Sequence, residues 1–327
     1  MKDLSIIIVN WNSAEYIRKC LSSIFRETKN LDFEVIVVDN ASYDGCEQIV
    51  RHEFCGVVFV QSDKNLGFAG ANNLGFRHSK GKALLFLNPD TEIIGAAIND
   101  MLSHLTSLND AGAVGCRLLN SDMSLQTSCI MPFPTILNQV LDTDYLKLLF
   151  PKMGLWGIKP LFSDGGPPEP VEVISGACMM IKRDVFEKVG LFSADYFMYS
   201  EDVDLCYKIN EAGYKIYHVS DAKVIHHGGR STSQKNENHF GAVLIRESIF
   251  NFLTKTKGRT YAQLYKVSMT FIAFTRLAVL LLLSPWLMFT TKKDAIYHTM
   301  RKWGKVLRWS LGLEKWCKDR HFLTGAV

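Results

Sequence analysis

The sequence predicts an α/β protein with a mostly parallel central sheet and flanking helices. Short apolar runs alternate with segments of helical periodicity through the first half of the chain, which is typical of strand–helix–strand units. Of the 327 residues, 47% are hydrophobic and 21% are charged, a composition that belongs to a folded protein and excludes general disorder. Two apolar runs end abruptly in acids, Asp39 and Asp90, as strands do where a parallel sheet presents its ligand-binding edge.

The alternation can be followed along the chain. Strands are expected over residues 5–9, 34–38, 56–60 and 83–87, and helices over 14–25, 45–51 and 69–78. An irregular segment, 130–172, follows and contains seven of the nine prolines. The pattern resumes with a strand over 173–181, a helix from about Arg183 and a short helix that ends near Gly213. Crossovers of this length favour parallel strand pairing.

Cysteine use and the N-terminus bear on the compartment. The eight cysteines include no CxxC pair and no regular spacing, which argues against a zinc site or a disulfide framework and favours a reducing compartment. The apolar run in MKDLSIIIVNWN is too short for the core of a signal peptide and is better explained as a first strand. We therefore expect a cytoplasmic location.

The C-terminal region has a different character. Residues 267–290 are strongly apolar but include Arg276 and Pro285, and the charge-free part is 14 residues long. As a helix that part would span roughly 21 Å, less than the roughly 30 Å of a bilayer core. Apolar residues then recur at helical spacing over 296–311 among lysines and arginines. This pattern predicts a basic amphipathic helix at a membrane surface; the alternative is a helical hairpin packed on the core.

Charge is also concentrated in this region. Nine Lys and Arg stand against three Asp and Glu between Lys292 and Arg320, whereas the whole chain has a net charge of +4. The body of the protein is therefore slightly acidic, and nonspecific attraction to anions is expected only in the tail.

Five stretches combine residue types that could carry chemistry. In LLFLNPDTEI an apolar run delivers Asp90 one residue after a proline, which restricts the backbone. In EVIVVDNAS a second run ends at Asp39. Carboxylates at the carboxyl edge of a sheet could hold a metal bound to a diphosphate. The alternative for both is a turn that caps the following helix.

The third stretch, DKNLGFAGANNLGF, is rich in glycine and asparagine, and glycine permits close approach of the backbone to a ligand. It does not contain the GxGxxG pattern, and the nearby Gly81-Lys82 pair does not complete a phosphate-binding loop. The stretch is therefore a weak indication of a binding loop when taken alone.

The fourth stretch, FMYSEDVDLCYKINEAG, places Glu201, Asp202 and Asp204 in the first turn of a short helix. Favourable interaction with the helix dipole is the alternative explanation for these acids. The fifth, VIHHGGRSTSQ, places His226 and His227 between an apolar run and two glycines. A histidine at such a turn could bind a metal that is already held by a carboxylate and a phosphate, although a lone histidine is usually structural.

Taken in order, these motifs resemble those of the family 2 glycosyltransferases, which have the GT-A fold, and among them the bacterial rhamnosyltransferase-type members that act on cell-envelope glycans. The resemblance covers roughly residues 4–235 and its order and spacing are specific. The matching segments are SIIIVNWNS, VIVVDNAS, NLGFAGANNLGF, LLFLNPDTEI, SGACMMIKRDVFEKVGLF, FMYSEDVDL and IHHGGRS.

The resemblance implies a role for each matching position. Asp39 would bind the nucleotide base or ribose, and Asp90 would be the metal-binding carboxylate of a DxD-like motif whose first acid is here Asn88. Asp202 matches the catalytic base, and His226 matches a histidine that approaches the metal or the diphosphate. The remaining residues expected at the nucleotide-sugar site are Asn10, Asn65, Gly67, Asn72 and Asn88, and those expected on the acceptor side are Glu201 and Asp204.

One departure concerns the acceptor side. Relatives often have Phe-Asp-Glu where this chain has Phe192-Ser193-Ala194, so two acids are missing there. This change is expected to alter the choice of acceptor.

The resemblance also implies a reaction. The expected enzyme is an inverting, Mg²⁺- or Mn²⁺-dependent hexosyltransferase that moves a sugar from a nucleotide-diphospho-sugar, with dTDP-rhamnose as the best single donor. Its acceptor would be a glycan or a polyprenyl-diphosphate-linked saccharide in cell-envelope polysaccharide (O-antigen, capsule or cell wall) biosynthesis. Another sugar from a UDP donor (galactofuranose, glucose or N-acetylglucosamine) is the first alternative, and a non-catalytic nucleotide-sugar-binding scaffold is a more distant one. No nucleic-acid partner is expected.

The division of the chain follows from the same resemblance. Residues 1–240 would form the GT-A catalytic domain, with a nucleotide-binding half at about 1–120 and an acceptor half at about 121–240. Residues 241–327 would form a helical, membrane-associating region. The protein would act at the cytoplasmic face of the plasma membrane as a peripheral or monotopic protein.

Overall fold

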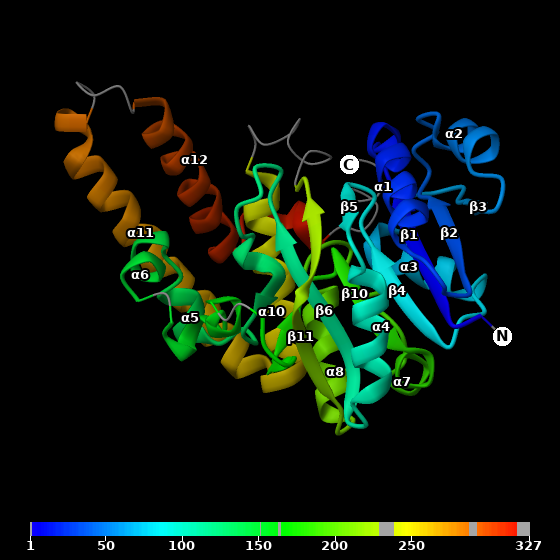
Figure 1. Ribbon diagram of the computed structural model, residues 1–327. Helices are drawn as coiled ribbons and strands as arrows, with labels where there is room; N and C mark the ends of the chain where they lie inside the picture. The colour runs from blue at the N-terminus through cyan, green and yellow to red at the C-terminus, as the bar shows by residue number, and fades with distance from the viewer. Residues whose placement is uncertain (1, 151, 163–164, 229–238, 288–292, 319–327) are drawn as a thin grey trace. The chain divides into compact units, whose positions relative to one another are not determined.

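The computed structural model describes residues 2–150, 152–162, 165–228, 239–287 and 293–318 (Figure 1). The chain divides into two compact units. The first comprises Met1–Phe133, Lys147–Phe197 and Glu201–Ser231, and the second comprises Pro134–Leu146, Met198–Ser200 and Thr232–Val327. The functional division predicted at residue 240 stays a prediction.

Within the described residues, the first unit contains a nine-stranded sheet in the order β3-β2-β1-β4-β10-β6-β11-β5, with β8 paired to β11. The strands are β1 (Leu4–Asn10), β2 (Phe33–Asp39), β3 (Val58–Gln61), β4 (Ala83–Leu87), β5 (Thr91–Ile94), β6 (Ala111–Leu119), β8 (Glu169–Val171), β10 (Cys178–Lys182) and β11 (Lys215–His226). A separate pair joins β7 (Ile130–Met131) to β9 (Val173–Ile174).

Most strands of the sheet run in one direction. Strands β3, β2, β1 and β4 are mutually parallel, and β6 and β11 follow the same direction. Strand β10 lies antiparallel between β4 and β6, while β5 and β8 run against β11. The predicted α/β architecture with a mostly parallel sheet is therefore confirmed.

The central strands are buried on both faces, as expected when helices cover a parallel sheet. Ile6, Ile7 and Ile8 of β1 and Phe86 of β4 have no exposed surface. Figure 1 shows the first-unit helices beside the sheet. They are α1 (Ala14–Glu27), α2 (Cys46–Glu53), α3 (Gly67–Arg77), α4 (Ala97–Ser107), α7 (Arg183–Lys188) and α8 (Glu201–Glu211).

Aromatic packing fixes α7 and the segment after it against β4. The ring of Phe86 lies 5.0 Å from that of Phe186 and 4.8 Å from that of Phe192, measured between centroids. The Phe86–Phe192 rings meet edge to face, and such pairs contribute about 0.5–1.5 kcal/mol beyond the burial of their area. This cluster supports the strand whose end carries Asn88.

Two expectations about local structure were wrong. The strand predicted over 173–181 is divided into β9 and β10, because Ser175–Ala177 form a turn in which the Cys178 N–H bonds to the Ser175 carbonyl. The segment 130–172 is not uniformly irregular. It also contains α5 (Ile136–Val140), α6 (Asp144–Leu149), η2 (Gly154–Trp156) and η3 (Lys159–Phe162), with η1 (Thr127–Cys129) just before it.

The second unit is helical. Helices α10 (Phe240–Lys257), α11 (Arg259–Leu287) and α12 (Lys293–Ser310) are followed by η5 (Lys315–Lys318). Ala273 of α11 packs against Trp303 and Val306 of α12, and the two helices run side by side in Figure 1. Thr290, Lys292 and Arg320, which bound the predicted apolar and basic segments, lie outside the described residues.

Candidate active site

Polar side chains collect at the carboxyl edge of the first unit's sheet. Strands β1, β2, β4 and β11 all end at this edge, in Asn10, Asp39, Leu87 and His226. Strand β10 begins there, because it runs in the opposite direction. The topology therefore brings together chain segments that are up to 216 residues apart.

Asp39 lies at the centre of a dense hydrogen-bonded loop. Its Oδ1 accepts from Asn10 Nδ2 at 2.8 Å and from the Ser42 hydroxyl. Its Oδ2 accepts from the backbone N–H groups of Ser42 and Tyr43 at 3.2 and 3.1 Å and from Gln61 Nε2 at 2.8 Å. Asp39 is only 1% exposed. Direct contact with a base or ribose stays a prediction, and it would require one of these protein donors to give way.

The pKa of Asp39 reflects two opposing effects. Burial disfavours the charged carboxylate, but the hydrogen bonds from Ser42, Asn10 and Gln61 together outweigh burial and lower the pKa below its ordinary value. The carboxylate is therefore ionised at neutral pH, and both of its oxygens accept hydrogen bonds from the protein.

Asparagine side chains join the loop after β2 to the loop before α3. Asn40 Nδ2 donates to Asn65 Oδ1 at 2.9 Å, and Asn40 Oδ1 accepts from the Leu66 N–H at 2.8 Å. Gly67 has a φ of +69°, and a Cβ there would lie 2.5 Å from the Phe197 carbonyl oxygen. These contacts explain the asparagines and the glycine structurally, and their predicted contacts with the nucleotide sugar stay predictions.

Asn72 lies apart from this loop. It is 2% exposed, and its amide donates to the Phe68 carbonyl of its own helix at 3.0 Å. Its predicted place at the nucleotide-sugar site stays a prediction.

Asn88, Asp90 and His226 form the second cluster at the edge. His226 Nε2 lies 3.4 Å from Asp90 Oδ1 and 3.2 Å from Asn88 Nδ2. Backbone pairing builds this geometry, because β11 places His226 opposite Thr91 and the His227 N–H bonds to the Asp90 carbonyl at 2.9 Å. The turn itself is closed by Thr91 Oγ1, which donates to the Asn88 carbonyl at 2.8 Å.

The two adjacent histidines have different surroundings. His227 Nε2 lies 2.8 Å from Glu92 Oε1, and its Nδ1 lies 2.8 Å from the Ser121 hydroxyl. Both histidines have protein groups at both ring nitrogens, but only His226 has its Nε2 beside Asp90. The residues after Gly228 in the predicted glycine turn lie outside the described residues.

Gln126 was missed by sequence reasoning. Its Oε1 lies 2.7 Å from His226 Nδ1, although the two residues are 100 positions apart. A single glutamine before a short 3-10 turn has no distinctive pattern, so no sequence signal marked it. Ser121 and Glu92, the partners of His227, were missed for the same reason.

Asp202 and Glu201 begin α8 after two residues with left-handed backbone, Tyr199 (φ 70°) and Ser200 (φ 65°). Such conformations cost about 1–3 kcal/mol each in residues other than glycine and are typical of functional sites. Asp202 Oδ1 accepts from the Val203 N–H at 2.8 Å, and Oδ2 accepts from the Gly176 N–H at 3.1 Å.

The two acids ionise unequally. Burial raises the pKa of both, and for Glu201 the charge of Asp202 raises it further, to about 8. Oε2 of Glu201 has no hydrogen-bond partner among the described residues, whereas Asp202 has two backbone donors. The raised pKa favours the neutral form of Glu201, whereas the two backbone donors favour the charged form of Asp202.

The Ser175–Ala177 turn connects the two acidic motifs. The Ala177 carbonyl accepts from the Asn88 N–H at 2.9 Å, while the Gly176 N–H donates to Asp202. A Cβ at Gly176 would lie 3.3 Å from the Phe68 ring and 3.5 Å from Asp202 Cβ. The turn thus holds Asp202 and the Asn88-Pro89-Asp90 segment at a fixed spacing.

Asp204 faces away from this turn. Its carboxylate accepts from the Ser193 and Tyr196 hydroxyls and pairs with Lys208 at 3.5 Å. These contacts fix the segment before α8 and so explain Asp204 structurally. Glu201 is only 7% exposed. The acceptor-side roles predicted for both residues stay predictions.

The donor set at Asp90 fits a divalent cation shared with a substrate. Within the described residues, three or more His, Cys, Asp or Glu side chains nowhere form a group that could enclose a metal. Asp90 and His226 supply one carboxylate oxygen and one imidazole nitrogen side by side. Mg²⁺ in particular is usually bound through one or two carboxylates together with substrate phosphates. Two protein ligands are thus a suitable number for a nucleotide-diphosphate site.

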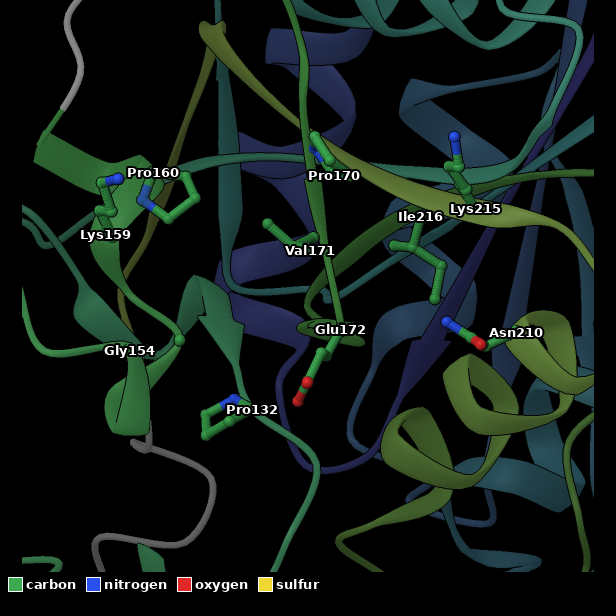
Figure 2. A pocket seen from close by; sticks show the side chains of 11 residues that line it. Pro132, Gly154, Lys159, Pro160, Pro170, Val171, Glu172, Asn210, Lys215 and Ile216 are labelled. Carbon is green, nitrogen blue, oxygen red and sulfur yellow. The ribbon is translucent and has the colours of Figure 1, made fainter.

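A cavity of about 340 Å³ lies at the other end of β11 (Figure 2). It is lined by Lys215 and Ile216 at the start of that strand, by Asn210 near the end of α8, and by Glu172 and Pro132. None of the predicted site residues lines it. It is therefore separate from the acidic edge.

Comparison with known proteins agrees with this geometry. Residues 5–190 match the family described as Glycosyl transferase family 2, and residues 155–304 match Glycosyl transferase family group 2. The chain is 30% identical to the Haloferax volcanii low-salt glycan biosynthesis hexosyltransferase Agl10 over 230 residues, covering 69% of this chain and 67% of the relative. It is 27% identical to the Mycobacterium tuberculosis N-acetylglucosaminyl-diphospho-decaprenol L-rhamnosyltransferase over 251 residues, covering 73% and 80%.

The fold has a solved counterpart. The mannosyltransferase PcManGT from Pyrobaculum calidifontis, solved in complex with GDP-Man and Mn²⁺, superimposes with a TM-score of 0.61 at 17% identity and covers 97% of this chain and 88% of that one. At this identity the likeness shows the fold alone, which is the GT-A fold. With more than half of its length matched by the family, the chain belongs to glycosyltransferase family 2.

Proposed function

We propose that the protein is an inverting, metal-dependent transferase that moves L-rhamnose from dTDP-rhamnose onto a glycan or polyprenyl-diphosphate-linked acceptor in cell-envelope polysaccharide synthesis. The observation that carries the reaction is the Ser175–Ala177 turn, which ties Asp202 to the segment that bears Asp90. Transfer needs a base for the acceptor and a site for the leaving diphosphate at a fixed separation, and this turn supplies that separation.

Each residue then has one task. Asp202 takes the proton from the acceptor hydroxyl as that oxygen attacks the anomeric carbon, and Glu201 stays protonated beside it. A divalent cation held by Asp90 and His226 would neutralise the charge of the departing diphosphate. One base on the side opposite the leaving group suffices for a single displacement, which inverts the anomeric configuration.

The nucleotide half of the donor is expected at the Asp39 loop. Asn10 and Asp39 end neighbouring strands in register, and β1 lies directly between β2 and β4. A nucleoside bound at this loop would therefore have its diphosphate directed toward Asp90. We propose Asn65, Gly67 and the backbone around them as the floor of this site.

The base assignment has a direct test. Asp202→Asn should keep nucleotide binding, measured by calorimetry with dTDP or UDP, but should lower the transfer rate by about 10²–10⁴. Glu211→Gln, at the exposed end of the same helix, is the matched control and should transfer normally. Turnover of Asp202→Asn at the wild-type rate would remove the assignment.

The donor sugar is a finer proposal. The rhamnosyl transfer named for the Mycobacterium relative supports dTDP-rhamnose, and the hexosyl transfer named for the Haloferax relative supports a different hexose donor. Thermal-shift assays with dTDP-rhamnose and UDP-linked galactofuranose, glucose and N-acetylglucosamine, each with Mn²⁺ or Mg²⁺, distinguish the two. Stabilisation by one UDP-sugar alone would replace rhamnose in the proposal.

We propose that residues 241–327 bind a membrane surface through α11. This helix is long and apolar enough to cross a membrane by length and composition, over Arg259–Leu282. One face packs on α12, and Arg276 stacks 4.2 Å from the ring of Trp303 on that side. The other face presents a row of side chains that are each more than half exposed: Leu264, Val267, Phe271, Phe274 and Leu282.

An apolar row beside the basic helix α12 is the composition of an interfacial membrane helix. The test is sedimentation with vesicles of phosphatidylglycerol and phosphatidylcholine. Val267→Glu combined with Phe271→Glu should release the protein into the supernatant. Val58→Glu, at an apolar position on β3 that is 41% exposed, should leave it bound. Equal sedimentation of all three proteins would contradict the proposal.

A further inference from the structure

We propose that Gln126 is a positioning residue that holds His226 in the tautomer protonated at Nδ1, so that Nε2 presents its lone pair toward Asp90. The proposal rests on the metal-dependent function proposed above and extends it to the loop between β6 and β7. Ligand histidines commonly bind a metal through one ring nitrogen and donate from the other to a fixed acceptor. Gln126 would be that acceptor.

The direction of each hydrogen bond follows from the one before it. Asp122 can only accept when ionised, so the Ser124 hydroxyl donates to its Oδ1 at 2.5 Å. The oxygen of Ser124 is thereby free to accept from Asn120 Nδ2 at 2.9 Å. The side-chain oxygen of Asn120, Oδ1, then faces Gln126 Nε2 at 3.0 Å.

The last step of this chain decides the orientation of Gln126. Its Nε2 lies between two acceptors, Asn120 Oδ1 at 3.0 Å and the His226 carbonyl at 3.5 Å. The amide group therefore cannot be turned around without placing an oxygen against two oxygens. Gln126 Oε1 must face His226 Nδ1 at 2.7 Å, and a carbonyl oxygen requires a proton on that nitrogen.

The other ring nitrogen agrees with this assignment. A neutral imidazole carries one N–H, so a proton on Nδ1 leaves Nε2 as an acceptor. Nε2 lies 3.2 Å from Asn88 Nδ2, which can only donate. The opposite tautomer would set two donors against each other at Asn88, and its Nε2–H would have only Asp90 Oδ1 as an acceptor, at 3.4 Å, which is longer than an ordinary N–H···O hydrogen bond. It would also remove the lone pair from the side that faces Asp90.

The loop is anchored well enough to hold this orientation. The Asn120 and Met123 N–H groups close it on the Ser124 and Asn120 carbonyls at 2.8 and 2.9 Å. The Gln126 N–H returns to the Leu118 carbonyl of β6 at 2.9 Å. The glutamine is therefore held by backbone as well as by side-chain bonds.

The first test observes the tautomer directly, without any reaction. Two-bond ¹H–¹⁵N correlation spectra of metal-free protein labelled in histidine, at pH 8, should show His226 protonated at Nδ1. Gln126→Met, which keeps the shape but lacks an acceptor, should mix the two tautomers. Protonation at Nε2 in wild type, or an unchanged signal in Gln126→Met, would overturn the proposal.

The second test measures the consequence for metal binding. Mn²⁺ titrations followed by electron paramagnetic resonance, with dTDP and with UDP in separate arms, should show affinity weakened about 10–100-fold in Gln126→Met. Equal affinity in wild type and Gln126→Met would overturn the link from tautomer to metal. Failure of wild type to bind Mn²⁺ in either arm would refute the proposed function but not the tautomer, which the spectra report separately.

One variant guards against loss of folding at Gln126. Asp122 is exposed, and the amide of Asp122→Asn can donate as well as accept at Ser124. The direction of the hydrogen bonds that run from Ser124 through Asn120 to Gln126 is then no longer fixed, although Gln126 itself is unchanged. Asp122→Asn should mix the tautomers less than Gln126→Met does while the protein stays folded. A pure Nδ1–H signal in both variants would overturn the proposal.

Discussion

Asp39 ends β2 and Asp90 follows the end of β4, in similar sequence settings, but their surroundings differ completely. Asp39 accepts hydrogen bonds from Asn10, Gln61 and the Ser42–Tyr43 segment. Among the described residues, one basic side chain lies within 4 Å of the Asp90 carboxylate, the imidazole of His226 at 3.4 Å. Protein donors fill the hydrogen-bonding positions of the Asp39 carboxylate, whereas those of the Asp90 carboxylate stay available to a ligand. We infer that Asp39 maintains the shape of the loop and that Asp90 receives a ligand.

The largest effect is expected at Asp90. Asp90→Asn keeps the shape of the side chain and removes its charge, so stabilisation of the leaving group should fall by several kcal/mol. This corresponds to a drop of about 10²-fold or more in kcat/KM. The midpoint of thermal unfolding should stay unchanged, because no hydrogen-bond donor in the described part of the chain depends on this carboxylate. A large loss of stability in Asp90→Asn would contradict the inference that Asp90, unlike Asp39, is not needed to maintain the structure.

The same substitution at Asp39 should act on stability. Asp39→Asn turns an NH₂ group toward donors that are already fixed, and buried donors left without an acceptor cost about 1–3 kcal/mol each. We expect a loss of about 2–4 kcal/mol in the free energy of unfolding, measured by urea titration. A variant as stable as wild type, with only nucleotide affinity reduced, would instead support direct contact of Asp39 with the nucleotide.

The smallest effect is a dependence on pH. The pKa of Asp39 is lower in the folded state than its ordinary value of 3.8. Its contribution to stability is therefore complete above that value and is lost as the pH falls through the folded-state pKa. The difference in stability between wild type and Asp39→Asn should narrow below about pH 4 in urea titrations. A gap that stays constant from pH 7 to pH 3 would show that charge is not what Asp39 supplies.

Periodicity predicted most of the sheet, because buried parallel strands are short, apolar and separated by amphipathic helices. The strands β1, β2 and β4 and the helices between them were expected within a few residues of their observed bounds. The antiparallel β10 could not be foreseen, since an apolar run such as 173–181 carries no information about its direction. Its interruption at Ser175–Ala177 depends on contacts with Asn88 and Asp202, which lie far away in the sequence.

The site was predictable where residue type and strand end coincide. Asp39, Asp90 and His226 each follow an apolar run, and the topology brings all three to one edge. Gln126 was not predictable, because its role depends on an amide orientation that is set by Asn120 through a loop of irregular conformation. Sequence patterns report periodicity and composition, but they do not report which atom of a side chain faces a partner.

The direction of β10 has a mechanical consequence. Because this strand enters the sheet at the carboxyl edge, one three-residue turn reaches both acidic motifs, and it does so through backbone groups of its own: the Ala177 carbonyl and the Gly176 N–H. Substitution of side chains in the turn can therefore leave the distance between Asp202 and the Asn88-Pro89-Asp90 segment unchanged. Substitutions in the segment before α8, such as at Ser193 and Ala194, can then accumulate without changing the distance between the two acidic motifs.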